Sequence, residues 1–217
     1  MNAALLSRRE INRAEKRARI TAAARALFTT KGFAATTTKE VARAAGVASG
    51  TVFTYAASKE ELLILVFHDE MLDVVARSFR SARALPKERV VERLTKYFSG
   101  LIEYHAEDLS LARALMRELG YLEGEQSRAL LDELMSAIYG HLADLLELED
   151  ASRGKRSAGA ASQARIVFAI YYLHLGAWLN AVVGRPRFEQ MLREDLTTLF
   201  SATDAAGPLP SADRAAS

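Results

Sequence analysis

Apolar residues recur every three or four positions along most of this 217-residue chain, a spacing typical of amphipathic helices. The segment 13–31 is an example, with apolar positions at Ile20, Ala23, Ala24, Leu27 and Phe28. The same spacing predicts further helices over residues 37–45, 48–55, 58–82, 88–105, 109–119, 125–147, 163–183 and 187–200. Only four prolines interrupt the pattern, so an all-α fold is expected.

Turn and capping signals are densest between residues 31 and 63. Thr37 and Glu40 form the Thr-x-x-Glu pattern of a capping box, and Ser58 with Glu61 repeats it as Ser-x-x-Glu. Gly46 ends the helix that starts at Thr37, and too few residues follow for a long loop. Two short helices joined by a tight glycine turn are predicted, which is a helix-turn-helix.

Charge is distributed unevenly along the chain. Residues 1–60 hold 11 Lys and Arg against 4 Asp and Glu, giving +7, whereas the remainder holds 18 against 23, giving −5, so the total is +2. A basic N-terminal portion indicates a polyanionic partner at that end, and duplex DNA is the polyanion that a helix-turn-helix binds.

The second helix of the motif carries small and hydroxyl side chains where base edges would be read. Val52 is expected to face the protein interior, while Tyr55 and Lys59 are expected to contact phosphates. The predicted DNA contacts are Thr37, Thr38, Ser49, Gly50, Thr51, Phe53, Thr54, Tyr55 and Lys59. The basic segment before the first helix, Arg8 to Arg19, either adds minor-groove or backbone contacts to DNA or is a solvated helix face.

The stretch "GFAATTTKEVARAAGVASGTVFTYAASKEELL", residues 32–63, resembles the DNA-binding region of the TetR family of transcriptional regulators. The likeness extends over about residues 13–67. It implies an N-terminal three-helix DNA-binding domain and a C-terminal helical domain for effector binding and dimerisation. It also implies a homodimer that binds an operator in duplex DNA and releases it when a small molecule binds. We therefore expect residues 1–57 to bind DNA, residues 58–200 to bind effector and dimerise, and residues 201–217 to be a disordered tail.

Three positions depart from the family pattern. Ala48 replaces the usual Ser or Thr cap of the second helix of the motif, and Ser49 is expected to cap it instead. Phe53 replaces a common tyrosine, and Ala56 replaces a bulky aromatic residue. These departures leave a second function open, namely a helical small-molecule-binding protein with a weakened DNA-reading region.

The C-terminal portion offers aromatic residues with a few polar tips, a composition that suits a hydrophobic or aromatic effector. The candidate ligand contacts are Phe98, Ile102, His105, Met116, Tyr121, Tyr139, Tyr171, His174 and Trp178. The same pattern is also typical of an ordinary aromatic core, and both interpretations stay open here.

Residues 166–183 contain no Asp, Glu, Lys or Arg, and their length reaches the lower limit of about 17 residues for a membrane-spanning helix. His174 and Asn180 interrupt the apolar run. We expect a helix buried within protein, with one face against its own domain and another against a second copy. An integral membrane protein is the third hypothesis, tested by solubility without detergent.

Enzyme chemistry finds little support in the sequence. The chain has no cysteine, no glycine-rich phosphate loop, no nucleophile elbow and no spacing that would bring three metal ligands together. We expect a protein that is not an enzyme, needs no cofactor and works in the cytoplasm, with no membrane partner.

Overall fold

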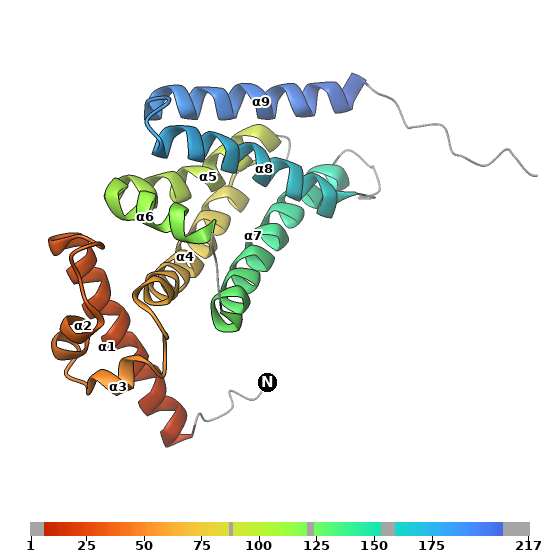
Figure 1. The fold of residues 1–217 in the computed structure, drawn as a ribbon. Coiled ribbons are helices and arrows are strands. Elements are labelled where there is room, and N and C mark those ends of the chain that lie inside the picture. Colours follow the sequence, from red (N-terminus) through yellow and green to blue (C-terminus); the bar gives the residue numbers. More distant parts are fainter. Residues whose placement is uncertain (1–6, 87–88, 121–123, 153–158, 206–217) are drawn as a thin grey trace, which may run out of the picture. The chain divides into compact units, whose positions relative to one another are not determined.

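The computed structural model describes residues 7–86, 89–120, 124–152 and 159–205, and within these ranges it contains nine α-helices and no strand (Figure 1). The all-α prediction is confirmed. The helices are α1 Arg8–Lys31, α2 Thr38–Ala44, α3 Ser49–Val52, α4 Lys59–Arg83, α5 Val90–Glu107, α6 Leu109–Leu119, α7 Glu125–Ser152, α8 Ala160–Leu179 and α9 Arg185–Ala205.

The chain divides into two compact units. The first comprises residues 1–79 and 99–138, and the second comprises residues 80–98 and 139–217. The division falls inside α4, α5 and α7, so each of these helices contributes residues to both units. The domain boundary expected between residues 57 and 58 stays a prediction.

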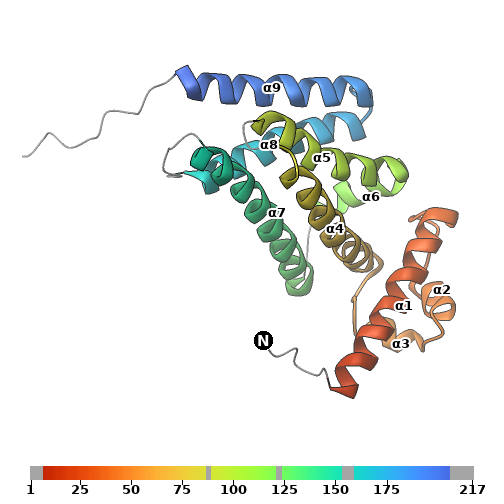
Figure 2. The ribbon, with the colours of Figure 1, turned by 180° about the vertical axis from the view of Figure 1, so that it is seen from behind.

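Helices α1, α2 and α3 lie together in the first unit (Figures 1 and 2). Because the sequence predicts that they bind DNA, they are called the DNA-binding region below. Helix α1 begins five residues earlier than predicted, because Ser7 and Glu10 form a capping box ahead of it. The backbone N–H of Glu10 donates to Ser7 Oγ at 3.3 Å, and the backbone N–H of Ser7 donates to Glu10 Oε2 at 2.7 Å. Arg8 to Arg19 therefore form the first turns of α1.

The turn between α2 and α3 follows the sequence prediction closely. The capping box of Thr37 and Glu40 is present at the start of α2. Gly46 has φ +64°, a left-handed conformation in which a side chain would be strained. Helix α3 then covers only Ser49–Val52, half the predicted length, because the hydrogen bonds of residues 54–56 form turns.

In the second unit, α8 and α9 form an antiparallel pair that lies side by side in both views (Figures 1 and 2). Trp178 of α8 stacks on Phe188 of α9, with ring centroids 5.5 Å apart and planes at 22°. His174 Nε2 contacts Asp195 Oδ2 at 2.7 Å, a second link between the two helices. Helix α8 ends at Leu179, four residues before the predicted end, and Ala181 in the following turn has φ +59°.

One face of α8 is buried and the other is open to solvent in the single chain. Tyr171, Leu175 and Leu179 are buried, whereas Leu173 is 71% exposed and Ile166 is 48% exposed. The expected burial of one face against its own domain is present, and burial of the other face against a second copy stays a prediction. Among the described residues, no helix has the length and apolar content that a membrane crossing requires.

The last helix is longer than predicted at both ends. Helix α9 starts at Arg185, and Pro186 lies in its first turn, where a missing N–H does no harm. Its backbone continues to Ala205, so residues 201–205 are helical. The remainder of the expected tail, residues 206–217, lies outside the described residues.

Candidate nucleic-acid interface

The edge of α3 presents small and hydroxyl side chains to solvent, and apolar side chains are buried beneath them. Ser49 and Gly50 are exposed, and Phe53 is 52% exposed. Val52 is fully buried beneath them, as predicted, together with Val41 of α2. An added Cβ at Gly50 would contact nothing within 4 Å, so another molecule can approach this backbone closely. Small and hydroxyl side chains of this kind suit contact with base edges in a major groove.

The N-terminus of α3 has no side-chain cap. Ala48 occupies the cap position with φ −66° and ψ 146°, and no side-chain hydrogen bond forms there. The expectation that Ser49 would replace it is wrong, because Ser49 is already the first helical residue. Asp, Asn, Ser and Thr stabilise this position by about 1 kcal/mol relative to alanine, so α3 lacks that contribution.

Cations line the first turns of α1. Five of them are exposed: Arg8, Arg9, Arg13, Lys16 and Arg19. On α2, Lys39 and Arg43 are exposed as well. These side chains can neutralise phosphates, while α3 itself contains no Arg or Lys that could pair with guanine.

Tyr55 and Lys59, which are predicted to contact phosphates, form hydrogen bonds inside the protein. Tyr55 is buried, and its hydroxyl donates to the Arg13 carbonyl at 3.1 Å. Lys59 Nζ donates to the carbonyls of Phe33 and Ala34, both at 3.0 Å, and lies 4.6 Å from the ring centroid of Phe33. Both side chains therefore hold the DNA-binding region together.

Two of the four threonines that are predicted to contact DNA, Thr37 and Thr38, lie at the start of α2. Thr37 is exposed but its hydroxyl pairs with Glu40 at 3.0 Å, and Thr38 is half-buried. The hydrogen bonds that Glu40 accepts from Lys31, and from the side chain and backbone of Thr37, lower the pKa of its carboxyl to about 2. This network fixes the entry to α2. Thr54 similarly donates to the Thr51 carbonyl at 2.7 Å.

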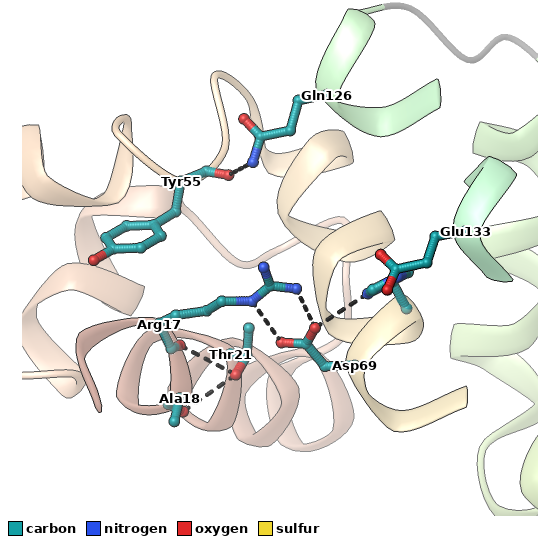
Figure 3. A network of polar contacts seen from close by, with 8 residues as sticks. Arg17, Ala18, Thr21, Tyr55, Asp69, Gln126 and Glu133 are labelled. Atoms are coloured by element: carbon teal, nitrogen blue, oxygen red, sulfur yellow. Dashed lines mark hydrogen bonds and ion pairs between the residues drawn. The ribbon is translucent and has the colours of Figure 1, made fainter. Parts of the chain in front are cut away.

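Arg17 attaches α1 to α4 by a bidentate contact with Asp69 (Figure 3). Its Nε donates to Asp69 Oδ2 at 3.0 Å, and its Nη2 donates to Oδ1. Burial alone would raise the pKa of the Asp69 carboxyl, but the hydrogen bonds from His68 and Arg17 outweigh that effect and lower it. Sequence periodicity could not show this pair, because its members are 52 positions apart.

Arg25 makes a second attachment between α1 and the rest of the first unit. It lies 3.3 Å from Glu70, 3.9 Å from Asp108 and 4.0 Å from Glu107. Its guanidinium also lies 5.9 Å from the ring centroid of Tyr104, whose hydroxyl donates to Glu70 at 2.7 Å. Burial and the Glu70 carboxylate raise the pKa of that hydroxyl well above its usual value.

The predicted effector contacts are divided between the two units. Phe98, Tyr139, Tyr171, His174 and Trp178 belong to the second unit, Ile102, His105 and Met116 belong to the first, and Tyr121 lies outside the described residues. In the second unit Phe98 stacks on Tyr171 at 4.5 Å with planes 8° apart. The buried Tyr171 hydroxyl has no hydrogen-bond partner among the described residues.

His105 borders a small cavity in the first unit. The cavity measures about 20 Å³, enough for about one water molecule, and it is also lined by Arg25, Tyr104 and Phe67. Burial lowers the pKa of the His105 imidazole to about 4, and its Nδ1 has no partner among the described residues. The cavity is too small for a hydrophobic effector. No group of three possible metal ligands occurs within the described ranges.

Comparison with known proteins finds similarity to bacterial regulators. Residues 20–66 match the model of a family described as bacterial regulatory proteins, tetR family. FadR from Thermus thermophilus, described as a TetR family transcriptional repressor and solved with lauroyl-CoA, is 25% identical. The match covers 90% of this chain and 98% of that chain, with a TM-score of 0.68.

Two further structures share the fold. FadR from Bacillus subtilis, solved with stearoyl-CoA, is 21% identical over 82% of this chain and 95% of its own, with a TM-score of 0.60. A TetR transcriptional regulator from Rhodococcus sp. RHA1 is 22% identical over 86% and 97%, with a TM-score of 0.63. No curated protein matches the sequence at a significant level.

Proposed function

Because the chain belongs to the TetR family of bacterial regulatory proteins, we propose that it is a repressor. It would bind an operator in duplex DNA as a homodimer and release it when a small hydrophobic molecule binds. The observation that carries this proposal is the exposed edge of α3, where Ser49, Gly50 and Phe53 stand over a buried Val52 beside the cations of α1. The protein would act by binding rather than by catalysis, in the cytoplasm.

Dimerisation would use the open face of α8. Leu173 and Ile166 are exposed apolar residues of α8, whose other face is buried. Exposed apolar patches mark interaction sites. A two-fold dimer would present two α3 edges to successive major grooves, about 34–36 Å apart. An effector that changes this separation would release the DNA.

The effector class to test first is a fatty acyl-CoA. The Thermus thermophilus and Bacillus subtilis regulators were solved with lauroyl-CoA and stearoyl-CoA. Buried aromatic side chains of this chain, such as Phe98 and Tyr171, suit an acyl or aromatic group.

The test combines in vitro selection of duplexes with fluorescence anisotropy. We expect the wild-type chain to enrich a duplex with two related half-sites, to bind it more tightly than random DNA, and to release it on addition of lauroyl-CoA. Selection without enrichment, at low salt, would contradict DNA binding. Tighter binding in the presence of lauroyl-CoA would contradict release.

A pair of matched variants locates the interface. Gly50→Glu places a carboxylate on the α3 edge without a clash, so it should weaken DNA binding at least about tenfold through repulsion from phosphates. Gly140→Glu makes the same change on an exposed part of α7, also without neighbours within 4 Å, and should leave DNA binding unchanged. Equal effects of the two variants would contradict the assigned surface.

The uncapped α3 supports a second candidate function. Without a side-chain cap at Ala48, α3 is less stable than a capped helix. A less stable α3 is expected in a protein that binds a small molecule but reads DNA weakly. Lauroyl-CoA binding without any selected duplex would favour this alternative.

A further inference from the structure

Residues 49–56, which comprise α3 and the turn after it, are called the recognition segment below. Its C-terminal end is held from two sides. Tyr55 follows α3, and its hydroxyl donates to the Arg13 carbonyl of α1 at 3.1 Å. Its own carbonyl accepts a hydrogen bond from Gln126 Nε2 of α7 at 2.9 Å (Figure 3). One residue at the end of the DNA-reading surface is therefore fixed by α1 through its side chain and by α7 through its backbone.

A second connection runs from α1 through α4 to α7. Arg17 pairs with Asp69, His68 Nδ1 lies 3.2 Å from Asp69 Oδ1, and His68 Nε2 lies 3.1 Å from Glu133 Oε2. The His68 ring lies between the carboxylates of Asp69 and Glu133 and is shielded from water, because His68 is buried. In Figure 3, Arg17 lies on one side of Asp69 and Glu133 lies on the other.

The start of α7 lies close to the start of α4. Gly124, one residue before α7, has φ +90°, and a Cβ there would collide with the Glu61 carboxylate. That carboxylate accepts a hydrogen bond from the backbone N–H of Ala57 at 2.7 Å, two residues after Tyr55. The beginning of α7 thus contacts Tyr55, which lies between α3 and α4, and Glu61 in the first turn of α4.

We propose that the first part of α7, residues 125–138, is a positioning element for the recognition segment, with Gln126 and Glu133 as its positioning residues. The inference rests on the proposed function, because it concerns how the DNA-reading surface is oriented. Helix α4 is attached to α1 of the DNA-binding region through Asp69 and Glu70. Helix α7 adds a separate attachment at Tyr55, just after the C-terminal end of α3. Displacement of the start of α7 would free the Tyr55 carbonyl from Gln126 even with α4 in place.

The experiment uses the full-length chain and the duplex that the wild type selects. Gln126→Leu removes the donor to Tyr55, and Glu133→Gln removes the carboxylate next to His68. Each should lower affinity for the selected duplex about 2- to 10-fold, the range that one hydrogen bond accounts for. Binding to random DNA and its salt dependence should stay unchanged, because neither variant removes a phosphate contact.

This split between selected and random DNA separates positioning from simple destabilisation, which would lower both affinities together. Hydrogen exchange of residues 49–56 supplies a measurement that needs no DNA, and Gln126→Leu should accelerate exchange there. The controls are Asp132→Asn, an exposed acid beside Glu133, and Gln190→Leu, whose amide donates to Glu194 on α9 at 2.7 Å. Both controls should behave like the wild type.

Unchanged exchange over 49–56 together with wild-type affinity for the selected duplex would overturn the positioning role and leave the proposed function intact. Failure of the wild type to select any duplex would overturn the proposed function, and the exchange measurement would then decide the attachment by itself. If Gln126→Leu does not fold, Gln126→Glu, which replaces the donor by an acceptor of the same size, takes its place with the same expected results.

Discussion

Single residues show that a side chain with the chemistry of a phosphate contact can also have a partner inside the protein. Tyr55 and Lys59 have the chemistry of phosphate contacts, yet both donate to carbonyls of the DNA-binding region. A hydroxyl or ammonium group that follows a recognition helix can serve either purpose. Only the path of α1 and of the turn before α2 decides which partner lies within reach.

Tyr55→Phe should therefore act on stability. Loss of the hydrogen bond to Arg13 should lower the free energy of unfolding by about 1 kcal/mol, measured by urea titration. The slope of DNA affinity against salt concentration should not change, because no phosphate contact is lost. Tyr172→Phe, at an exposed tyrosine on α8, is the matched control. A reduced salt slope with unchanged stability would restore the phosphate role.

His105 should make stability depend on pH. Its pKa in the folded chain is about 4 because of burial, against 6.5 as the usual value. The unfolded state therefore binds more protons between these values, so stability is present above pH 6.5 and is lost as the pH falls toward 4.

The loss between pH 7 and pH 5 should be roughly 2 kcal/mol, and His105→Phe should remove it. Urea titrations at the two pH values give the measurement. The same pH dependence in the variant and the wild type would show that another group is responsible.

At the level of helices, local signals located most elements and missed details that depend on packing. The capping box at Thr37 and the glycine turn at Gly46 were predicted and are present. The box formed by Ser7 and Glu10 has the same signature, but it precedes charged rather than apolar residues, and so the predicted start of α1 came too late. The predicted start of the last helix at residue 187 came two residues too late, because Pro186 fits within a first helical turn.

Ala48→Ser should supply the cap that α3 lacks. The backbone at residue 48 already has the extended conformation of a capping residue, so a serine hydroxyl can accept from the N–H groups that follow. We expect stability to rise by about 1 kcal/mol in urea titration. Ala35→Ser, an exposed position in the turn before α2, should have no effect. A destabilised Ala48→Ser would mean that the cap position is constrained by a neighbour.

At the scale of the whole molecule, the DNA-binding region could be predicted because it depends on short-range turn chemistry. The attachments of that region could not, since Arg17 with Asp69 and Gln126 with Tyr55 join residues 52 and 71 positions apart. Nothing in a helical period specifies such pairs. The predicted effector contacts remain predictions, because aromatic residues at helical spacing line cores and ligand sites alike.

Leu173→Glu tests the assembly. The residue is 71% exposed on the apolar face of α8, so a carboxylate there should oppose pairing of two copies while leaving each chain folded. Sedimentation should show a monomer, and affinity for the selected duplex should fall at least about 100-fold because two half-sites are no longer bound together. Ser136→Glu, at an exposed position of α7, should remain dimeric. A dimeric Leu173→Glu variant would place the interface elsewhere.

The stacking of Trp178 on Phe188 has a practical consequence. Since the sequence holds one tryptophan, emission excited selectively from tryptophan originates in the α8–α9 pair and carries no signal from the DNA-binding region. Circular dichroism, in contrast, sums over every helix. Superimposable urea curves from the two methods would indicate a single cooperative transition, and displaced curves would reveal that the two compact units melt separately.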